Sequence, residues 1–184
     1  MKITVIVPAN KPIKTLTVES LLNMVASSPY EFLIIIATEG YTPSEKRNYG
    51  VVRSLNENCD YTFFVDDDMV FPPETLKTLI GRDKDVIGGL YYIKHEPLVP
   101  VVELLGEIQK EPFRCKGVGA GLLLVKNSVL RKIKPPWFDT KVNEFGQTII
   151  GDSYWFCDKV REREFEIWSD PTLSVSHIGE KLYG

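Results

Sequence analysis

YTFFVDDDMVFPPETL (61–76) places three consecutive aspartates, Asp66, Asp67 and Asp68, directly after a run of aromatic and β-branched residues. The run 61–66 is typical of a strand buried on both faces. The segment 72–80 opens on two prolines, as short helices often do. Like charges this close together repel one another, and a partly buried carboxylate is costly unless a positive group meets it. The stretch therefore predicts a strand that ends at a site for a positive partner.

Apolar runs and helical segments alternate on both sides of this stretch. Buried strands are expected at 3–8, 32–38, 61–66 and 85–92, with helices at 14–26, 43–57 and 72–80 between them. Further along, strands are expected at 98–105 and 119–125, a helix at 152–164, and two short strands around a turn within 165–179. The alternation predicts an α/β fold, a Rossmann-like three-layer sandwich with a mostly parallel central sheet.

Composition excludes several classes of protein. A chain of 184 residues with 43% hydrophobic and 26% charged residues fits one globular domain. Its net charge of −3 gives no overall basic footprint for nucleic acid and leaves only a local basic patch open. No stretch approaches the roughly 18 apolar residues of a membrane span, so contact with a membrane would be peripheral. The three cysteines have no C-x-x-C spacing and are expected to be reduced thiols of a cytoplasmic protein.

The aspartates themselves favour a divalent cation as the missing partner. In an extended chain, Asp66 and Asp68 point to one side and Asp67 to the other. Ligands of α/β sheets bind beyond the carboxyl ends of the strands, where these residues lie. Two carboxylates suit Mg²⁺ or Mn²⁺, which keeps several waters and adds substrate phosphates to its shell. The alternative is a turn or helix-capping cluster, which three aspartates at the end of a buried strand make less favoured.

The chain resembles glycosyltransferases of the GT-A fold, family 2-like. The resemblance rests on the order of six segments between residues 3 and 179: ITVIVPAN, EKRNYG, FFVDDDMVFPPETL, GAGLLLVKNSVL, GDSYWFCDKVREREFEIWSDP and VSHIG. It implies one domain over 1–184, with a nucleotide-binding half, 1–92, and an acceptor-binding and metal-completing half, 93–184. It also implies transfer of a sugar, with inversion, from a UDP- or GDP-linked donor to a hydroxyl of a glycan, lipid or protein, with Mn²⁺ or Mg²⁺.

The resemblance also assigns roles to individual residues. The implied contacts to the nucleotide sugar are Pro8, Ala9, Asn10 and Glu39 at the base, Arg47 and Asn48 near the ribose and diphosphate, and Asp66 and Asp67 at the ribose and metal. The implied metal ligands are Asp66, Asp68 and His177.

The two histidines lie in different sequence contexts. A lone histidine such as His177 is more often structural than a ligand, but neutral imidazole binds Mn²⁺ well, and the family pattern favours a ligand. His95 is expected to be a solvated loop residue. Its neighbour Lys94 could touch a phosphate, although a single lysine carries no argument.

The catalytic base is where the chain departs from the family. An acceptor hydroxyl has a pKa far above 7, so an inverting enzyme needs a carboxylate to remove its proton. The family places an acidic pair ahead of Phe-Cys, and the matching positions here are Asp152 and Ser153. Asp152 is the candidate base, and its alternative is an ordinary helix N-cap.

Two further motifs leave alternatives open. The segment GVGAGLLLV (117–125) is either a close approach of the backbone to the donor sugar or a glycine-rich turn before a strand. Trp137 is either an acceptor contact, since aromatic rings stack on sugars, or a core residue of its loop.

Two rival functions remain. A non-catalytic protein that binds metal and nucleotide sugar is favoured by Ser153. A nucleotidyltransferase would need a glycine- and arginine-rich loop after the first strand, and VPANKPIK (7–14) has neither residue.

Overall fold

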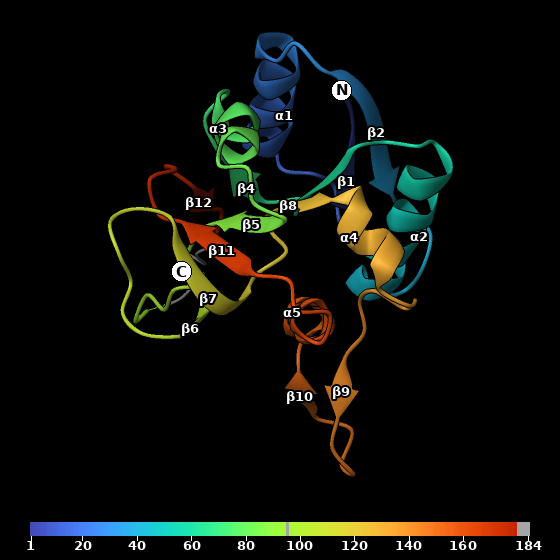
Figure 1. Cartoon of the computed structure of the whole chain (residues 1–184), viewed down its shortest axis with the longest axis vertical. Coiled ribbons are helices and arrows are strands. Elements are labelled where there is room, and N and C mark those ends of the chain that lie inside the picture. Colours follow the sequence, from blue (N-terminus) through green and yellow to red (C-terminus); the bar gives the residue numbers. More distant parts are fainter. Residues whose placement is uncertain (95, 180–184) are drawn as a thin grey trace, which may run out of the picture.

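The computed structural model describes residues 1–94 and 96–179, and its centre is a mixed sheet of eight strands between two layers of helices (Figure 1). The helices are α1 Thr15–Ser27, α2 Pro43–Asn56, α3 Thr75–Gly81, α4 Asn127–Lys132 and α5 Asp152–Arg161. The strands are β1 Lys2–Pro8, β2 Glu31–Ala37, β3 Tyr61–Val65, β4 Met69–Val70, β5 Val86–Gly89, β6 Val102–Leu104, β7 Phe113–Val118, β8 Leu122–Lys126, β9 Lys141–Val142, β10 Thr148–Ile150, β11 Ile167–Asp170 and β12 Ser176–His177. His95, which we expect to be solvated, lies outside the described residues.

The strand order in the large sheet is β2-β1-β3-β8-β5-β11-β7-β6. Strands β7 and β8 run antiparallel to their neighbours, and the other six share one direction. The predicted α/β class is therefore confirmed, with two reversed strands that make the sheet mixed. Because β1 and β3 are adjacent and parallel, their carboxyl ends meet at the same edge.

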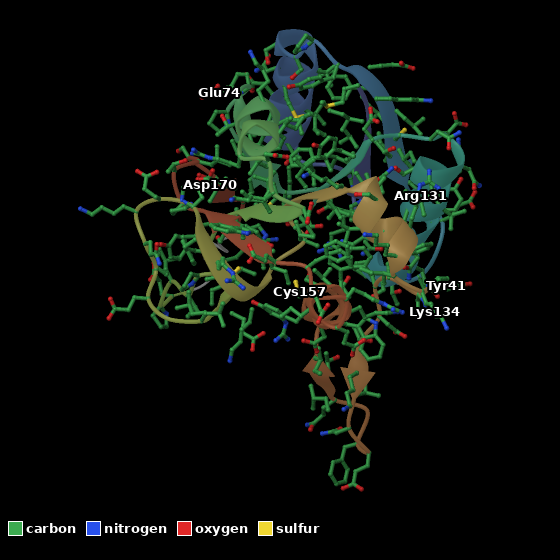
Figure 2. The ribbon with its side chains drawn as sticks, in the orientation of Figure 1. Tyr41, Glu74, Arg131, Lys134, Cys157 and Asp170 are labelled. Atoms are coloured by element: carbon green, nitrogen blue, oxygen red, sulfur yellow. The ribbon has the colours of Figure 1, made fainter. Side chains whose placement is uncertain are left out.

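Two apolar clusters cover the two faces of the sheet. Strand β3 shows the alternation, since Phe63 and Val65 pack toward α1 and α3, whereas Phe64 packs toward α2, α4 and α5. Cys157 lies on the side of α5 that packs against the sheet (Figure 2), and burial there raises the pKa of its thiol to about 12. All three cysteines are free and buried.

The elements of the first half match the expected ones closely, with one correction. We expect 32–38 to be a buried strand, and β2 is instead the edge of the sheet, with Ile34 and Ile36 48% and 54% exposed. A run of isoleucines has the same pattern in an edge strand as in a central one, so the sequence does not distinguish the two.

Other elements depart further from expectation. Helix α4 and strands β4, β7, β9 and β10 are not anticipated, β5 ends at Gly89, and β8 begins only at Leu122. The hairpin of β9 and β10 projects away from the sheet beyond α5 (Figure 1). Within the described part of the chain, no helix combines the length and apolar character needed to cross a membrane.

Candidate functional site

A cavity of about 460 Å³ opens at the carboxyl ends of β1 and β3. Its walls combine the ends of these strands with the first turns of α2 and α5, the segment after β5, and β12. The lining residues are Pro8, Asn10, Lys11, Pro43, Arg47, Asp66, Asp67, Asp68, Lys94, Asp152, Ser153 and His177. The fold thus brings together most of the residues that the sequence singles out.

Arg47 bridges two carboxylates from distant parts of the chain. Its Nη2 lies 2.5 Å from Oδ1 of Asp66, and its Nη1 donates a hydrogen bond to Oδ2 of Asp152. Burial disfavours the charged form of Arg47, but Asp66 and Asp152 outweigh burial and raise its pKa. The guanidinium therefore stays charged and joins β3 to α5 at the floor of the cavity.

The placement of Arg47 follows from how α2 begins and packs. Thr42 and Glu45 form a capping box at the N-terminus of α2. One turn after Arg47, Gly50 lies against Ile6 of β1 so closely that a Cβ atom would come within 2.5 Å of the Ile6 side chain. This close approach of α2 to the sheet brings the arginine to the end of β3.

Asp68, away from the Arg47 bridge, has two positively charged or hydrogen-bonding partners of its own. Nε2 of His177 lies 3.2 Å from its Oδ1, and Lys94 forms an ion pair with its Oδ2. Burial alone would raise the pKa of Asp68, but the hydrogen bonds from His177 and Lys94 prevail and lower it. His177 is oriented from behind, since its Nδ1 lies 3.1 Å from the carbonyl oxygen of Tyr92 and its strand β12 pairs with β4.

Asp67 lies between Asp66 and Asp68 in the sequence, and its negative charge is the least compensated of the three. Partial burial, followed by the charges of Asp68 and Asp66, raises its pKa, although backbone hydrogen bonds from Lys11 and Asn10 oppose the shift. The three aspartates occupy a tight turn after β3 and not an extended strand. All three consequently reach the same cavity, in contrast to the predicted alternation.

Asp152 is the first residue of α5, and Gly151 is the N-cap. Its Oδ1 accepts a hydrogen bond from the backbone N–H of Ser153 at 2.8 Å, and its Oδ2 accepts from Arg47. Ser153 has a separate function, since its Oγ accepts a hydrogen bond from the N–H of Ala120 at 3.1 Å. Asp152 therefore faces the cavity as a carboxylate, and Ser153 fastens the turn that precedes β8.

Tyr91 contacts His177 without lining the cavity, and its ring lies edge-on to the imidazole with 5.5 Å between the centroids. It is buried, its hydroxyl accepts a hydrogen bond from the N–H of Gly121 at 3.1 Å, and burial together with nearby Asp66 raises its pKa. A Cβ atom at Gly119 would come within 2.1 Å of the Tyr91 hydroxyl, and one at Gly121 within 2.7 Å. Gly119 and Gly121 thus make room for Tyr91, which no local sequence pattern indicates, whereas a Cβ atom at Gly117 would meet the ring of Tyr154.

Four residues of the expected donor and acceptor contacts do not line the cavity. Ala9 is buried beneath it, and Glu39 is exposed outside it. Asn48 instead holds the loop before β9, donating to the carbonyl of Phe138 at 2.7 Å and accepting from the N–H of Trp137 at 2.9 Å. Trp137 is only 7% exposed and its Nε1 donates to the carbonyl of Leu130, so its ring belongs to the core, the alternative left open above.

The residues present fit a divalent cation that keeps an open shell. Within residues 1–94 and 96–179, no three histidine, cysteine, aspartate or glutamate side chains form a ready metal cage. Asp68 and His177 nevertheless present a carboxylate and an imidazole 3.2 Å apart, with Asp66 on the same cavity. This donor set suits Mn²⁺ or Mg²⁺, whose remaining ligands are typically water and phosphate oxygens.

Comparisons with known proteins identify the fold. No protein-family model and no curated protein matches the sequence. Among solved structures, A197 from STIV superposes with a TM-score of 0.70 at 19% identity, over 98% of this chain and 87% of that one. GalNAc-T7, solved with UDP, GalNAc and Mn²⁺, gives 0.58 at 13% identity, over 100% of this chain and 44% of its own. The inositol-1-phosphate CTP transferase from T. maritima gives 0.55 at 14% identity, over 97% of this chain and 89% of its own. The chain therefore has the GT-A fold that the resemblance implied, and glycosyltransferases and nucleotidyltransferases share this fold.

Proposed function

We propose that this protein transfers a sugar from a nucleoside diphosphate sugar, UDP- or GDP-linked, to a hydroxyl group of a glycan, lipid or protein. The observation that carries the proposal is the convergence of Asp66, Asp67, Asp68, Asp152 and His177, from three segments far apart in the chain, on one cavity at the carboxyl edge of the sheet. A nucleotide-sugar site needs ligands for a cation and a base for the acceptor, and the carboxylates and the imidazole that line this cavity are of the types that these two roles require.

The first half of the chain, 1–92, provides the donor side. Pro8 and Asn10 line the cavity where β1 ends and are assigned to the nucleobase, with Lys11 beside them as a positive charge for the donor. Asp68 and His177, together with Asp66 on the same cavity, would hold the cation, and Asp66 and Asp67 are assigned to the ribose. When bound, such a cation stabilises the negative charge that develops on the leaving diphosphate.

The second half, 93–184, provides His177, the acceptor side and the base. Asp152 is assigned to remove the proton of the acceptor hydroxyl, so that the oxygen displaces the diphosphate in one step with inversion. Arg47 and the backbone of Ser153 hold its two oxygens, which fixes the carboxylate in place while further lone pairs stay open to the cavity.

Two alternatives are kept because specific observations favour them. One alternative is a protein that binds metal and nucleotide sugar without turning the sugar over. It is favoured by the ion pair of Asp152 with Arg47, and by the serine, Ser153, at the position where the family has the second acid of its pair. The shared fold keeps nucleotidyl transfer open, although the loop after β1 has no glycine and its only cation lining the cavity is Lys11.

Release of nucleoside diphosphate tests the proposal without knowledge of the acceptor, since water can take its place. The purified chain is incubated with UDP- and GDP-sugars in the presence of Mn²⁺ or of EDTA. Metal-dependent release from one donor supports the transferase. Mn²⁺-dependent nucleotide binding without release from any donor identifies the binding protein, and pyrophosphate release from a nucleoside triphosphate and a sugar phosphate identifies the nucleotidyltransferase.

Asp68→Ala separates the cation from the fold. Because Asp68 lies in a turn at the rim of the sheet, we expect the variant to lose metal-dependent release by about 100-fold or more, with a melting temperature within about 3 °C of the parent. Asp83→Ala, which removes an exposed carboxylate paired with Lys126, is the matched control. Unchanged Mn²⁺-dependent nucleotide binding in Asp68→Ala contradicts the cation assignment.

A further inference from the structure

The chain itself occupies both oxygens of the carboxylate assigned to the cation. Oδ1 of Asp68 faces His177 at 3.2 Å, and Oδ2 is held by the ammonium group of Lys94. Both Asp68 and Lys94 line the main cavity and a smaller neighbouring one of about 210 Å³. A positive charge from the protein therefore stands at the ligand atom that a divalent cation would need.

Lys94 differs from the other cation that pairs with the aspartates. The side chain of Arg47 is 5% exposed and pairs with two carboxylates, whereas the side chain of Lys94 is 39% exposed and pairs with one. An ammonium group on a flexible four-carbon stem is well hydrated, and it loses little when water replaces a single partly exposed carboxylate. Lys94 is thus the cation of this site that a ligand can displace.

Two contacts hold the backbone immediately before Lys94. The N–H of Ile93 donates to the carbonyl of Val99 at 3.0 Å, and the carbonyl of Tyr92 lies 3.1 Å from Nδ1 of His177. The segment that carries Lys94 therefore also orients His177. Displacement of the ammonium would leave Asp68 and His177 in place, side by side.

We propose that Lys94 is a tethered counter-cation of the divalent-ion site. Its ammonium neutralises Asp68 while no metal ion is bound, yields Asp68 to the metal ion, and then faces the diphosphate of the donor in the same cavity. This inference rests on the proposed function, because it takes Asp68 and His177 as the cation ligands.

Two consequences follow from the exchange. A metal ion alone must displace Lys94 without compensation, so its affinity is reduced. With a nucleoside diphosphate present, the displaced ammonium gains a new anionic partner, so nucleotide and metal ion strengthen each other's binding by the same factor.

Electron paramagnetic resonance of free Mn²⁺ measures both consequences on the full chain. We expect Lys94→Met to bind Mn²⁺ about two- to fivefold more tightly than the parent without nucleotide, the range expected for removal of one partly exposed ion pair. The factor by which UDP or GDP tightens Mn²⁺ binding should fall in the same variant. Lys94→Arg, which keeps the charge, should bind Mn²⁺ as weakly as the parent.

Lys126→Met is the control, because it removes the same charge from ion pairs with Asp83 and Asp85 outside the cavity. It should leave Mn²⁺ affinity unchanged, which separates the local contact from net charge. A merely structural lysine would lower the melting temperature of Lys94→Met without tightening Mn²⁺ binding, and that result, like an unchanged Mn²⁺ affinity, overturns the inference.

Asp68→Ala in the same titration keeps the two proposals apart. If Asp68→Ala loses Mn²⁺ binding and Lys94→Met binds like the parent, only the role of Lys94 fails. If Asp68→Ala binds Mn²⁺ like the parent, the cation site itself is wrong, and the role of Lys94 fails with it.

Discussion

The two ends of the aspartate triplet meet positive charge in opposite ways. Asp66 faces the buried guanidinium of Arg47, which also holds Asp152 from a helix 105 residues further along the chain. Asp68 faces the ammonium group of Lys94, whose side chain is partly exposed, and the imidazole of His177. One end is an internal bridge, and the other is open to exchange with a ligand.

The difference shows how one short run of like charges can be both structural and functional. A buried arginine cannot give up its partners, because an uncompensated charge in the interior costs several kcal/mol. A lysine near water can, because a screened pair contributes little. The bridge therefore sets the shape of the cavity, while the exchangeable end receives whatever cation or phosphate enters it.

Arg47→Met tests the bridge and should have the largest effect. The substitution keeps much of the side-chain volume and leaves Asp66 and Asp152 without their cation. We expect the free energy of unfolding to fall by about 3–5 kcal/mol, measured by urea denaturation in EDTA. Arg53→Met on the same helix, whose guanidinium contacts only Tyr49 among the described residues, should change it by less than about 0.5 kcal/mol. A loss below about 1 kcal/mol for Arg47→Met would mean that the bridge is as loose as the Lys94 pair.

Asp152→Asn separates the bridge from catalysis. Asparagine keeps an oxygen for Arg47 and loses the negative charge that a base requires. We expect nucleoside diphosphate release to fall by roughly 100-fold, with Mn²⁺ affinity within about twofold of the parent because the cation end is untouched. Asp158→Asn, further along α5 and paired with Arg161 at the surface, is the control. Equal release by Asp152→Asn and the parent would leave Asp152 as a partner of Arg47 only.

The sequence predicts the elements that carry the site better than it predicts the contacts between them. Strand β3 and its aspartates follow from local rules, because an apolar run that ends in carboxylates has few other interpretations. The same rules place helix α2 and hence Arg47. The pair of Arg47 and Asp152 depends on how α5 packs under the sheet, and no spacing in the chain encodes that distance.

Strand β7 escapes prediction because its own sequence has no strand pattern. Strand β7, FRCKGV, carries arginine, lysine and glycine and lacks an apolar run, so its place in the sheet comes from pairing with β11 and β6. Lys94 carries no signal alone, and only the fold brings it to Asp68. Asn48 shows the converse, since a residue next to the site in sequence points away from it and holds the loop at Trp137.

Asp67 lies between the two ends, and Asp67→Asn should have the smallest effect, with opposite signs for stability and binding. Burial and the charges of Asp68 and Asp66 raise the pKa of Asp67 above its ordinary value of 3.8, so the folded chain holds this proton more tightly than the unfolded chain. The resulting stability is present below that ordinary value and is lost as pH rises through the raised pKa. Removing the charge should therefore raise the melting temperature at pH 7 in EDTA by roughly 1–3 °C, and the gain should vanish near pH 3. Glu39→Gln, at an exposed carboxylate outside the cavity, should show no such gain. If the more stable Asp67→Asn variant also binds nucleotide more weakly in the presence of Mn²⁺, the charge of Asp67 serves ligand binding and lowers the stability of the fold. A lower melting temperature of the variant at pH 7 would instead mean that Asp67 stabilises the fold, as the Arg47 bridge does.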